Sequence, residues 1–196
     1  MQGFNIDQRE YSLEKVKFLF QSLKNFQQMG TVIRSSPSMC RKMSHFIDSH
    51  DDLIIVELGA GDGVITSFIL DKMSPEAKLY VFEINTELCA VISKINDPRM
   101  ILVNDSAEHM ETYLIKHGIT QVDTIISAIP FLVLPDDLTK DILMAGKKML
   151  KTGGNFIQMH YVSSIKKMYK NIFGNVHTYF VPVNIPPGYV FRCVKE

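Results

Sequence analysis

The segment ELGAGDG at residues 57–63 holds the residues whose types and spacing point most clearly to chemistry. It lies where an apolar, strand-like run at 53–58 gives way to a helical pattern at 64–73. Glycines at such a turn let the chain bend tightly and let a ligand approach the backbone. A dinucleotide-binding G-x-G-x-x-G would need glycine at Val64, so the spacing here is G-x-G-x-G behind an acidic residue. The segment therefore predicts a ligand site between the first strand and the first helix.

Two further polar signals follow the next predicted strands. Glu83 ends the run 78–83, and a carboxylate at that position can accept hydrogen bonds from both hydroxyls of a ribose. The segment NDSA at 104–107 follows the run 99–103 and can either meet an adenine edge or cap the next helix. All three signals fall at the carboxyl ends of successive strands, which is where open α/β sheets bind ligands.

The elements that position these residues alternate between strands and helices from residue 51 onward. This alternation predicts an α/β fold, a doubly wound and mostly parallel seven-stranded sheet covered by helices on both faces. Two consecutive strands at the end predict an antiparallel hairpin at one edge. We expect a helical extension at 1–50 and one ligand-binding domain at 51–196. The predicted strands are 53–58, 78–83, 99–103, 122–128, 155–161, 176–183 and 188–194, and the predicted helices are 64–73, 86–95, 106–118, 136–150 and 163–174.

The composition of the 196 residues is that of a soluble globular protein, with 46% hydrophobic and 21% charged residues and a formal net charge of zero. Three scattered cysteines are too few for a disulfide framework or a zinc site, so we expect no metal and a reducing, cytoplasmic setting. No run reaches the roughly 18 apolar residues that span a bilayer. Acidic residues concentrate in the middle of the chain and basic residues near both ends, which indicates either flanks for an anionic surface or solvated charge alone.

An amphipathic helix is predicted at residues 10–29. Its apolar positions recur at helical spacing and lysines flank them, so the helix either packs on the domain or lies in a membrane interface. The apolar stripe is formed by Leu13, Val16, Phe20, Leu23 and Phe26.

The motifs VELGAGDG, VFEIN and NDSAE together resemble, in order and spacing, the cofactor motifs of class I S-adenosylmethionine-dependent methyltransferases. The resemblance implies a Rossmann-like fold with S-adenosyl-L-methionine as cofactor. It places the first motif on the methionine moiety, Glu83 on the ribose, and Asp105 with Ser106 on the adenine. The full set of expected cofactor contacts is Gly30, Thr31, Val32, Glu57, Gly59, Ala60, Gly61, Gly63, Glu83, Ile84, Asp105, Ser106, Ala107 and Ser127.

Four outer segments, MGTVIRSSP, SAIPF, QMHY and NIPPGYV, resemble bacterial phospholipid N-methyltransferases of the phosphatidylethanolamine type. The resemblance implies a phospholipid amine as substrate and peripheral attachment through residues 10–29, cytoplasmic on the inner face of the cell membrane. Many relatives have arginine at Val183 and threonine at His160, so the lipid head group stays open. The expected catalytic residues are Tyr161 and Ser127, and the expected substrate contacts are Ile129, Pro130, Phe131, His160, Tyr161, Asn184 and Tyr189.

Strand alternation qualifies two of these expectations. It sends His160 and Tyr161 to opposite faces of the sheet, so only one of them serves the acceptor, and it turns Ser127 away from the expected acceptor side. An RNA adenine dimethyltransferase is the alternative, because Pro130-Phe131 matches the end of its acceptor motif. Ala128 stands where that motif places its amine-holding side chain, which disfavours nucleic acid as a partner. A cofactor-binding membrane module without turnover is the third possibility.

Overall fold

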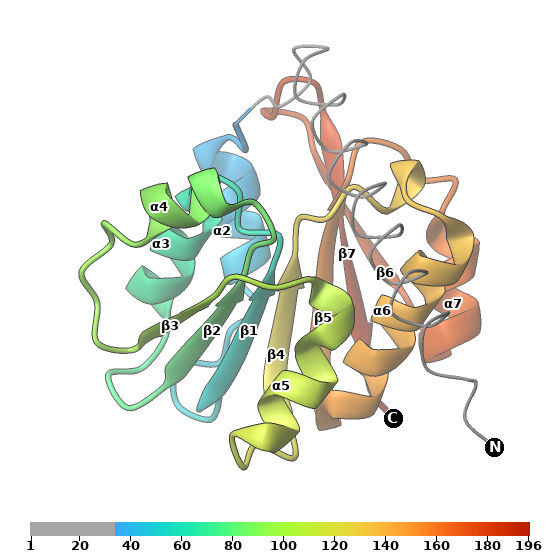
Figure 1. Cartoon of the computed structure of the whole chain (residues 1–196). Coiled ribbons are helices and arrows are strands. Elements are labelled where there is room, and N and C mark those ends of the chain that lie inside the picture. Colours follow the sequence, from blue (N-terminus) through green and yellow to red (C-terminus); the bar gives the residue numbers. More distant parts are fainter. Residues whose placement is uncertain (1–33) are drawn as a thin grey trace, which may run out of the picture. The chain divides into compact units, whose positions relative to one another are not determined.

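The computed structural model describes residues 34–196, which form one compact unit around a seven-stranded sheet (Figure 1). The strand order is β3-β2-β1-β4-β5-β7-β6. Strands β1 to β5 are parallel to one another. Strand β7 runs antiparallel to both of its neighbours, β5 and β6. The strands are β1 (Ile54–Leu58), β2 (Lys78–Phe82), β3 (Met100–Val103), β4 (Val122–Ser127), β5 (Leu150–His160), β6 (His177–Val181) and β7 (Gly188–Val194).

Helices cover both faces of the sheet, as the alternation of patterns predicts (Figure 1). One face carries α2, α3 and α4, and the other carries α5, α6 and α7. This arrangement follows from right-handed crossovers between parallel strands on either side of β1. The helices are α2 (Pro37–Ser44), α3 (Val64–Lys72), α4 (Thr86–Ile92), α5 (Met110–Lys116), α6 (Asp136–Met149) and α7 (Lys166–Phe173), with short 3-10 turns η1 (Ala107–His109) and η2 (Phe131–Val133).

The central strands are buried on both faces, so their sequences are largely apolar rather than alternating. Ile55 belongs to the core cluster beneath α2 and α3, together with Leu79 and Val81 of β2. On the opposite face Phe82 packs edge to face with Tyr113 of α5 at 5.5 Å. Because both layers are tightly filled, the ends of the strands are held at fixed positions relative to one another.

The antiparallel hairpin predicted for the end of the chain is present at one edge of the sheet, with β6 outermost. Strand β5 begins at Leu150, whereas the sequence pattern placed its start at 155. Gly153 and Gly154 lie between the predicted helix 136–150 and the predicted strand, and their backbone pairs with Lys195 beyond β7, through bonds of 2.7 and 3.0 Å. These residues therefore extend the strand.

The compact unit starts at Arg34, so residues 34–50, which the sequence analysis placed in the extension, pack with the sheet. Met39, Cys40 and Met43 of α2 are fully buried in the core cluster. The predicted helix at 10–29 and the expected cofactor contacts at 30–32 lie outside the described residues. Within residues 34–196, no helix has the length and apolarity needed to cross a membrane.

Candidate active site

The glycine-rich loop joins β1 to α3 at the carboxyl end of the sheet. Gly59 has a φ of +72°, and its amide donates to the Phe82 carbonyl at 2.8 Å. A Cβ on Gly59 would lie 2.8 Å from Cγ1 of Ile129, so glycine permits close approach of the loop that follows β4. The loop is therefore held by β2 through the Phe82 carbonyl and packed against Ile129 after β4, and glycine is the residue that this close packing requires.

Gly61 is the open position of the same loop. Its φ is +61°, its amide donates to Oε2 of Glu83 at 2.9 Å, and a Cβ placed on it would meet nothing within 4 Å. Since the backbone at Gly61 borders empty space at the end of the sheet, this position can lie against a ligand without steric conflict. A bound cofactor needs such an open stretch of backbone.

Glu57 of β1 lies beneath this loop and is 1% exposed. Its Oε2 accepts a hydrogen bond of 2.6 Å from Thr66 of α3, while its Oε1 is buried with no hydrogen-bond partner among the described residues. The pKa of Glu57 is raised to about 8, mainly by burial and in smaller part by the charges of Glu83 and Asp62, while the hydrogen bond from Thr66 opposes the rise. An unpaired buried carboxylate is costly, so a bound cation would stabilise this site. The ammonium group of a methionine moiety supplies such a charge.

Glu83, just after β2, links two loops of the site. Besides the bond from Gly61, its Oε1 accepts the Asn85 amide at 2.8 Å, and Asn104 donates to the Glu83 carbonyl at 2.9 Å. Burial raises the pKa of Glu83, while the backbone amides oppose that rise. The ends of β1, β2 and β3 are thus tied together through one carboxylate and one amide. The sequence pattern predicts that residues 104–107 belong to the site, but it does not predict the hydrogen bond between Asn104 and the Glu83 carbonyl.

Asp105, Ser106 and Ala107 follow β3, as expected for an adenine site. Oδ1 of Asp105 accepts the Ser106 amide at 2.7 Å and lies 2.8 Å from Nδ1 of His109. Ser106 is 2% exposed, and its hydroxyl is buried with no partner among the described residues. An unpartnered hydroxyl beside a carboxylate fits the polar edge of a base.

The loop after β4, expected to hold the acceptor, is braced from one face of the sheet. Ser127 and Gln158 are neighbours in the β4–β5 register, and both are fully buried. The Ser127 hydroxyl accepts the Ile129 amide at 3.3 Å, and Nε2 of Gln158 donates to the Ile129 carbonyl at 2.9 Å. Ser127 therefore positions the loop, and its orientation agrees with the strand alternation. Gln158 was not among the expected site residues, although the QMHY motif contains it.

Pro130 and Phe131 continue this loop. Phe131 is only 2% exposed, and its carbonyl accepts the Thr139 hydroxyl at 3.2 Å. This placement makes Phe131 a packing residue of the loop. Its expected contact with substrate is not tested by the structure and stays a prediction.

His160 and Tyr161 lie on opposite faces, as alternation predicts. Nε2 of His160 lies 2.9 Å from the Tyr169 hydroxyl of α7, in an aromatic cluster with Phe191. Burial lowers the pKa of His160 to about 4, so the imidazole is neutral at physiological pH. This position gives His160 a structural role and does not favour the expected contact with substrate.

Tyr161 is half-buried on the face that carries α2. Burial raises the pKa of its phenol, and a hydrogen bond with the Asn184 side chain opposes the rise. Asn184 is 1% exposed; its Oδ1 accepts the Ser36 amide at 2.9 Å, and its Nδ2 donates to the Pro186 carbonyl at 2.7 Å. Asn184 thus holds the start of α2, the β6–β7 turn and Tyr161 together. Tyr189, also expected to meet substrate, is half-buried with its ring 5.3 Å from Phe180.

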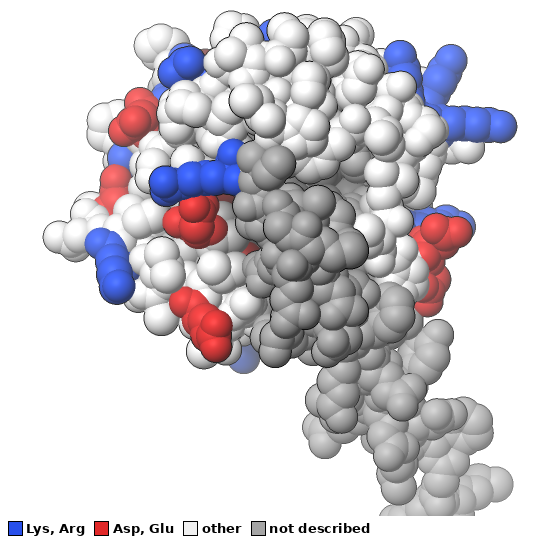
Figure 2. Space-filling view, turned by 90° about the horizontal axis from the view of Figure 1, so that it is seen from above, with Lys and Arg blue, Asp and Glu red and all other residues white. Residues whose placement is uncertain are grey.

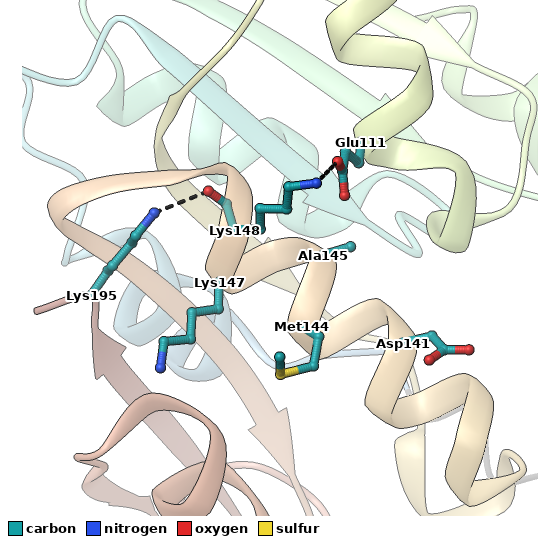
Figure 3. Close-up of a pocket in the computed structure, with 7 residues that line it drawn as sticks. All are labelled: Glu111, Asp141, Met144, Ala145, Lys147, Lys148 and Lys195. Carbon is teal, nitrogen blue, oxygen red and sulfur yellow. Dashed lines mark hydrogen bonds and ion pairs between the residues drawn. The ribbon is translucent and has the colours of Figure 1, made fainter.

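A separate groove lies along α6 (Figure 3). Lys148 pairs with Glu111, Lys147 donates to the Ile172 carbonyl, and Lys195 donates to the carbonyls of Lys148 and Leu150. Because these ammonium groups are already hydrogen-bonded within the chain, we assign the groove no site.

Comparison with known proteins agrees with this geometry. The sequence profile of the family "Methyltransferase small domain" matches residues 42–182, which is more than half of the chain. The chain belongs to this family. A relative of similar length is an ornithine lipid N-methyltransferase of Singulisphaera acidiphila, 29% identical over 92% of this chain and 99% of that protein. A ribosomal RNA small subunit methyltransferase H of Christiangramia forsetii is 29% identical over 46% of this chain and 30% of its own.

Solved structures share the fold of this methyltransferase. The 1,6-didemethyltoxoflavin-N1-methyltransferase of Burkholderia thailandensis, with bound S-adenosylhomocysteine, aligns with a TM-score of 0.66 at 12% identity over 100% of this chain and 93% of that one. An rRNA methylase of Streptococcus thermophilus aligns at 0.61 with 17% identity over 84% of this chain and 100% of that one. The protein is a methyltransferase with S-adenosylmethionine as cofactor, and the expected class I fold is confirmed. Three features fit that cofactor. Glu57 and Ser106 each have a buried oxygen without a hydrogen-bond partner among the described residues, and Gly61 borders open space.

Proposed function

We propose that this methyltransferase transfers a methyl group to the amine of a membrane lipid. The observation that carries the proposal is the similarity to an ornithine lipid N-methyltransferase along nearly the whole length of both chains. The ribosomal RNA relatives match a smaller part of this chain and about a third or less of their own. A lipid amine also agrees with the four outer motifs of the sequence. We expected phosphatidylethanolamine; the relative instead favours a wider class of amine-bearing lipids.

The chemistry sets two demands on the chain. When bound, S-adenosylmethionine supplies an electrophilic methyl on a sulfonium. An alkyl ammonium has a pKa near that of lysine, about 10.4, so the amine must lose a proton to expose its lone pair. The amine must then lie in line with the methyl, since alignment supplies much of the rate. As the new N–C bond forms, the S–C bond breaks and its electron pair stays on sulfur.

Tyr161 is the residue we assign to alignment of the amine. Its pKa is raised by burial, so the phenol keeps its proton at physiological pH and its oxygen is a weak base. It therefore accepts a hydrogen bond from the amine and orients the lone pair, while the amine proton leaves to water. Asn184 fixes the phenol in turn. Contact of residues 10–29 with the inner face of the membrane is part of the same proposal.

Incorporation of labelled methyl groups tests the proposal. The full-length protein is incubated with S-adenosylmethionine labelled in the methyl group and, separately, with ribosomal RNA and three kinds of vesicle. The vesicles contain ornithine lipid, phosphatidylethanolamine, or only phosphatidylcholine with phosphatidylglycerol. Label in either amine-bearing vesicle supports the proposal, and the comparison of the two assigns the head group. Label in RNA alone contradicts it.

A further inference from the structure

The turn between β6 and β7, residues 182–187, is an exposed apolar tip that is linked to Tyr161 through Asn184. Ile185 is 75% exposed and Val183 is 69% exposed, which makes them the most exposed large apolar side chains that the structure describes. Phe180, at the end of β6, is 57% exposed, and Val162, just after β5, is 42% exposed. Leaving this much apolar surface in water is unfavourable, so a cluster of this kind marks an interaction site.

The C-terminal part of the chain, which contains the tip, carries basic charges over most of its length. Between Asp141 and Glu196 the sequence contains no acidic residue. Lys166, Lys167 and Lys170 are exposed on α7, the helix that follows β5. Seen from above, the end of the sheet has a broad uncharged area with a group of basic side chains at one edge (Figure 2). An apolar tip and basic side chains at the same end of the molecule complement an anionic bilayer, in which apolar groups enter the acyl boundary and lysines meet the head groups.

The tip is rigidly connected to the acceptor site. Asn184, between the two exposed side chains, is buried and holds Ser36, Pro186 and the phenol of Tyr161. A Cβ on Gly188, at the base of the tip, would lie 3.0 Å from the His160 carbonyl and 3.7 Å from the Tyr161 ring. The depth of the tip in a bilayer would therefore fix the height of Tyr161 above it.

We propose that the β6–β7 turn inserts into the surface of an anionic lipid bilayer and brings Tyr161 to the level of the lipid amines. The inference rests on the proposed lipid substrate and adds the surface that meets the membrane. A bilayer is favoured over a protein partner because the apolar groups protrude on a short turn, flanked by the exposed Pro182 and Pro187, and form a wedge rather than a flat face.

A tryptophan introduced by substitution can report the insertion by its fluorescence, because the natural chain contains no tryptophan. Val183→Trp places the fluorophore on the tip, and Leu53→Trp places it at another exposed apolar position, just before β1 at the opposite end of the sheet. Vesicles of phosphatidylglycerol and phosphatidylethanolamine with brominated acyl chains should shift the emission of Val183→Trp to the blue and quench it. They should leave Leu53→Trp unchanged. Equal quenching of both, or of neither, overturns the inference. Emission of Val183→Trp that is blue-shifted without vesicles also overturns it, since another part of the chain or a second copy then covers the tip.

A double variant separates this inference from the proposed function. Val183→Ser with Ile185→Ser changes only exposed side chains, so the fold should survive. Vesicle affinity should fall about tenfold or more, as expected for removing two apolar groups from the membrane. Methyl transfer to vesicle lipid should fall in parallel, while transfer to the same lipid dispersed in detergent should persist. If the double variant binds vesicles with wild-type affinity, the proposed insertion is wrong, while the proposed methylation of lipids is unaffected. A wild-type protein that methylates no lipid overturns the proposed function instead, whatever the tryptophan reports.

Discussion

Glu83 accepts a hydrogen bond of 2.9 Å from the backbone amide of Gly61, so the carboxylate at the end of β2 holds the open position of the glycine-rich loop. The two residues are 22 positions apart in sequence, and their contact unites the expected ribose site with the expected methionine site. The cofactor site is thus one hydrogen-bonded unit rather than a set of independent contacts.

Glu83→Ala should weaken S-adenosylmethionine binding. The substitution removes the ribose acceptor and also leaves the amides of Gly61 and Asn85 without their carboxylate partner. Each lost partner in a buried site costs about 1–3 kcal/mol, so calorimetry should show at least a severalfold loss of affinity. Glu76→Ala, which removes an exposed carboxylate between α3 and β2, is the control and should bind normally. Wild-type affinity in a folded Glu83→Ala protein would refute the assignment.

Gly61→Ala and Gly118→Ala form a matched pair. Both glycines have positive φ, +61° and +78°, and a Cβ on either meets nothing within 4 Å. Each substitution should therefore cost a similar backbone strain of about 1 kcal/mol in the free energy of unfolding. Only Gly61→Ala should weaken cofactor binding, because its Cβ would enter the space against the ligand. Denaturant unfolding and calorimetry on both variants test this, and equal cofactor affinities would contradict it.

Glu57 should make the stability of the cofactor-free protein depend on pH. Its folded pKa of about 8 lies above the ordinary value of 4.5, so the folded state binds the proton more tightly than the unfolded state. The contribution of this group to stability is fully present below about pH 4.5 and declines as the pH rises toward 8. Glu57→Gln should therefore flatten the decline in Tm between these values, whereas Glu76→Gln should not. Parallel curves for wild type and Glu57→Gln would count against the buried carboxyl.

The same group should release a proton when cofactor binds. Near pH 7 the Glu57 carboxyl is largely protonated, and a ligand ammonium favours its ionised form. Calorimetric titrations in buffers of different ionisation enthalpy should detect this release in the wild-type protein and lose it in Glu57→Gln. An identical proton balance in both proteins would place the ammonium elsewhere.

Tyr161→Phe should lower turnover strongly while cofactor affinity stays the same. The variant keeps the ring and removes the hydroxyl that aligns the amine, and a misplacement of about 1 Å between reacting groups can cost roughly 10²-fold in rate. The loss should appear mainly in kcat, since the bond matters most in the transition state. Tyr179→Phe removes a hydroxyl from β6 and serves as the control. If Tyr161→Phe turns over at the wild-type rate, Tyr161 is a packing residue.

The sequence was sufficient to predict the sheet and the meeting of the glycine-rich loop with Glu83 at its edge. Glycine spacing around Gly59 and Gly61 depends on local backbone geometry, and the carboxyl ends of parallel strands must share one edge. Glu83 could therefore be placed beside the loop before any coordinates were known. The pairing of consecutive strands likewise follows from short right-handed crossovers.

The acceptor side depends on contacts that local patterns do not encode. Gln158 braces Ile129, 29 residues away, through the register of β4 with β5. Asn184 holds the Ser36 amide across 148 residues, so its role emerges only once the hairpin and α2 are packed. The same holds for the early start of β5, since the pairing of Gly153 with Lys195 is a tertiary contact. His160 could be recognised as a structural residue only from its contact with Tyr169.

We propose that Glu57, Gly61 and Glu83 hold the cofactor and that Tyr161 aligns a lipid amine for methylation. Mass spectrometry of vesicle lipids after incubation with the full-length protein and S-adenosylmethionine tests it most directly. An amine-bearing lipid should gain mass in steps of one methyl-for-hydrogen replacement on its head-group nitrogen, and Glu83→Ala and Tyr161→Phe should suppress the gain. Lipids of unchanged mass, in a reaction where the same protein demonstrably binds the cofactor, would contradict it.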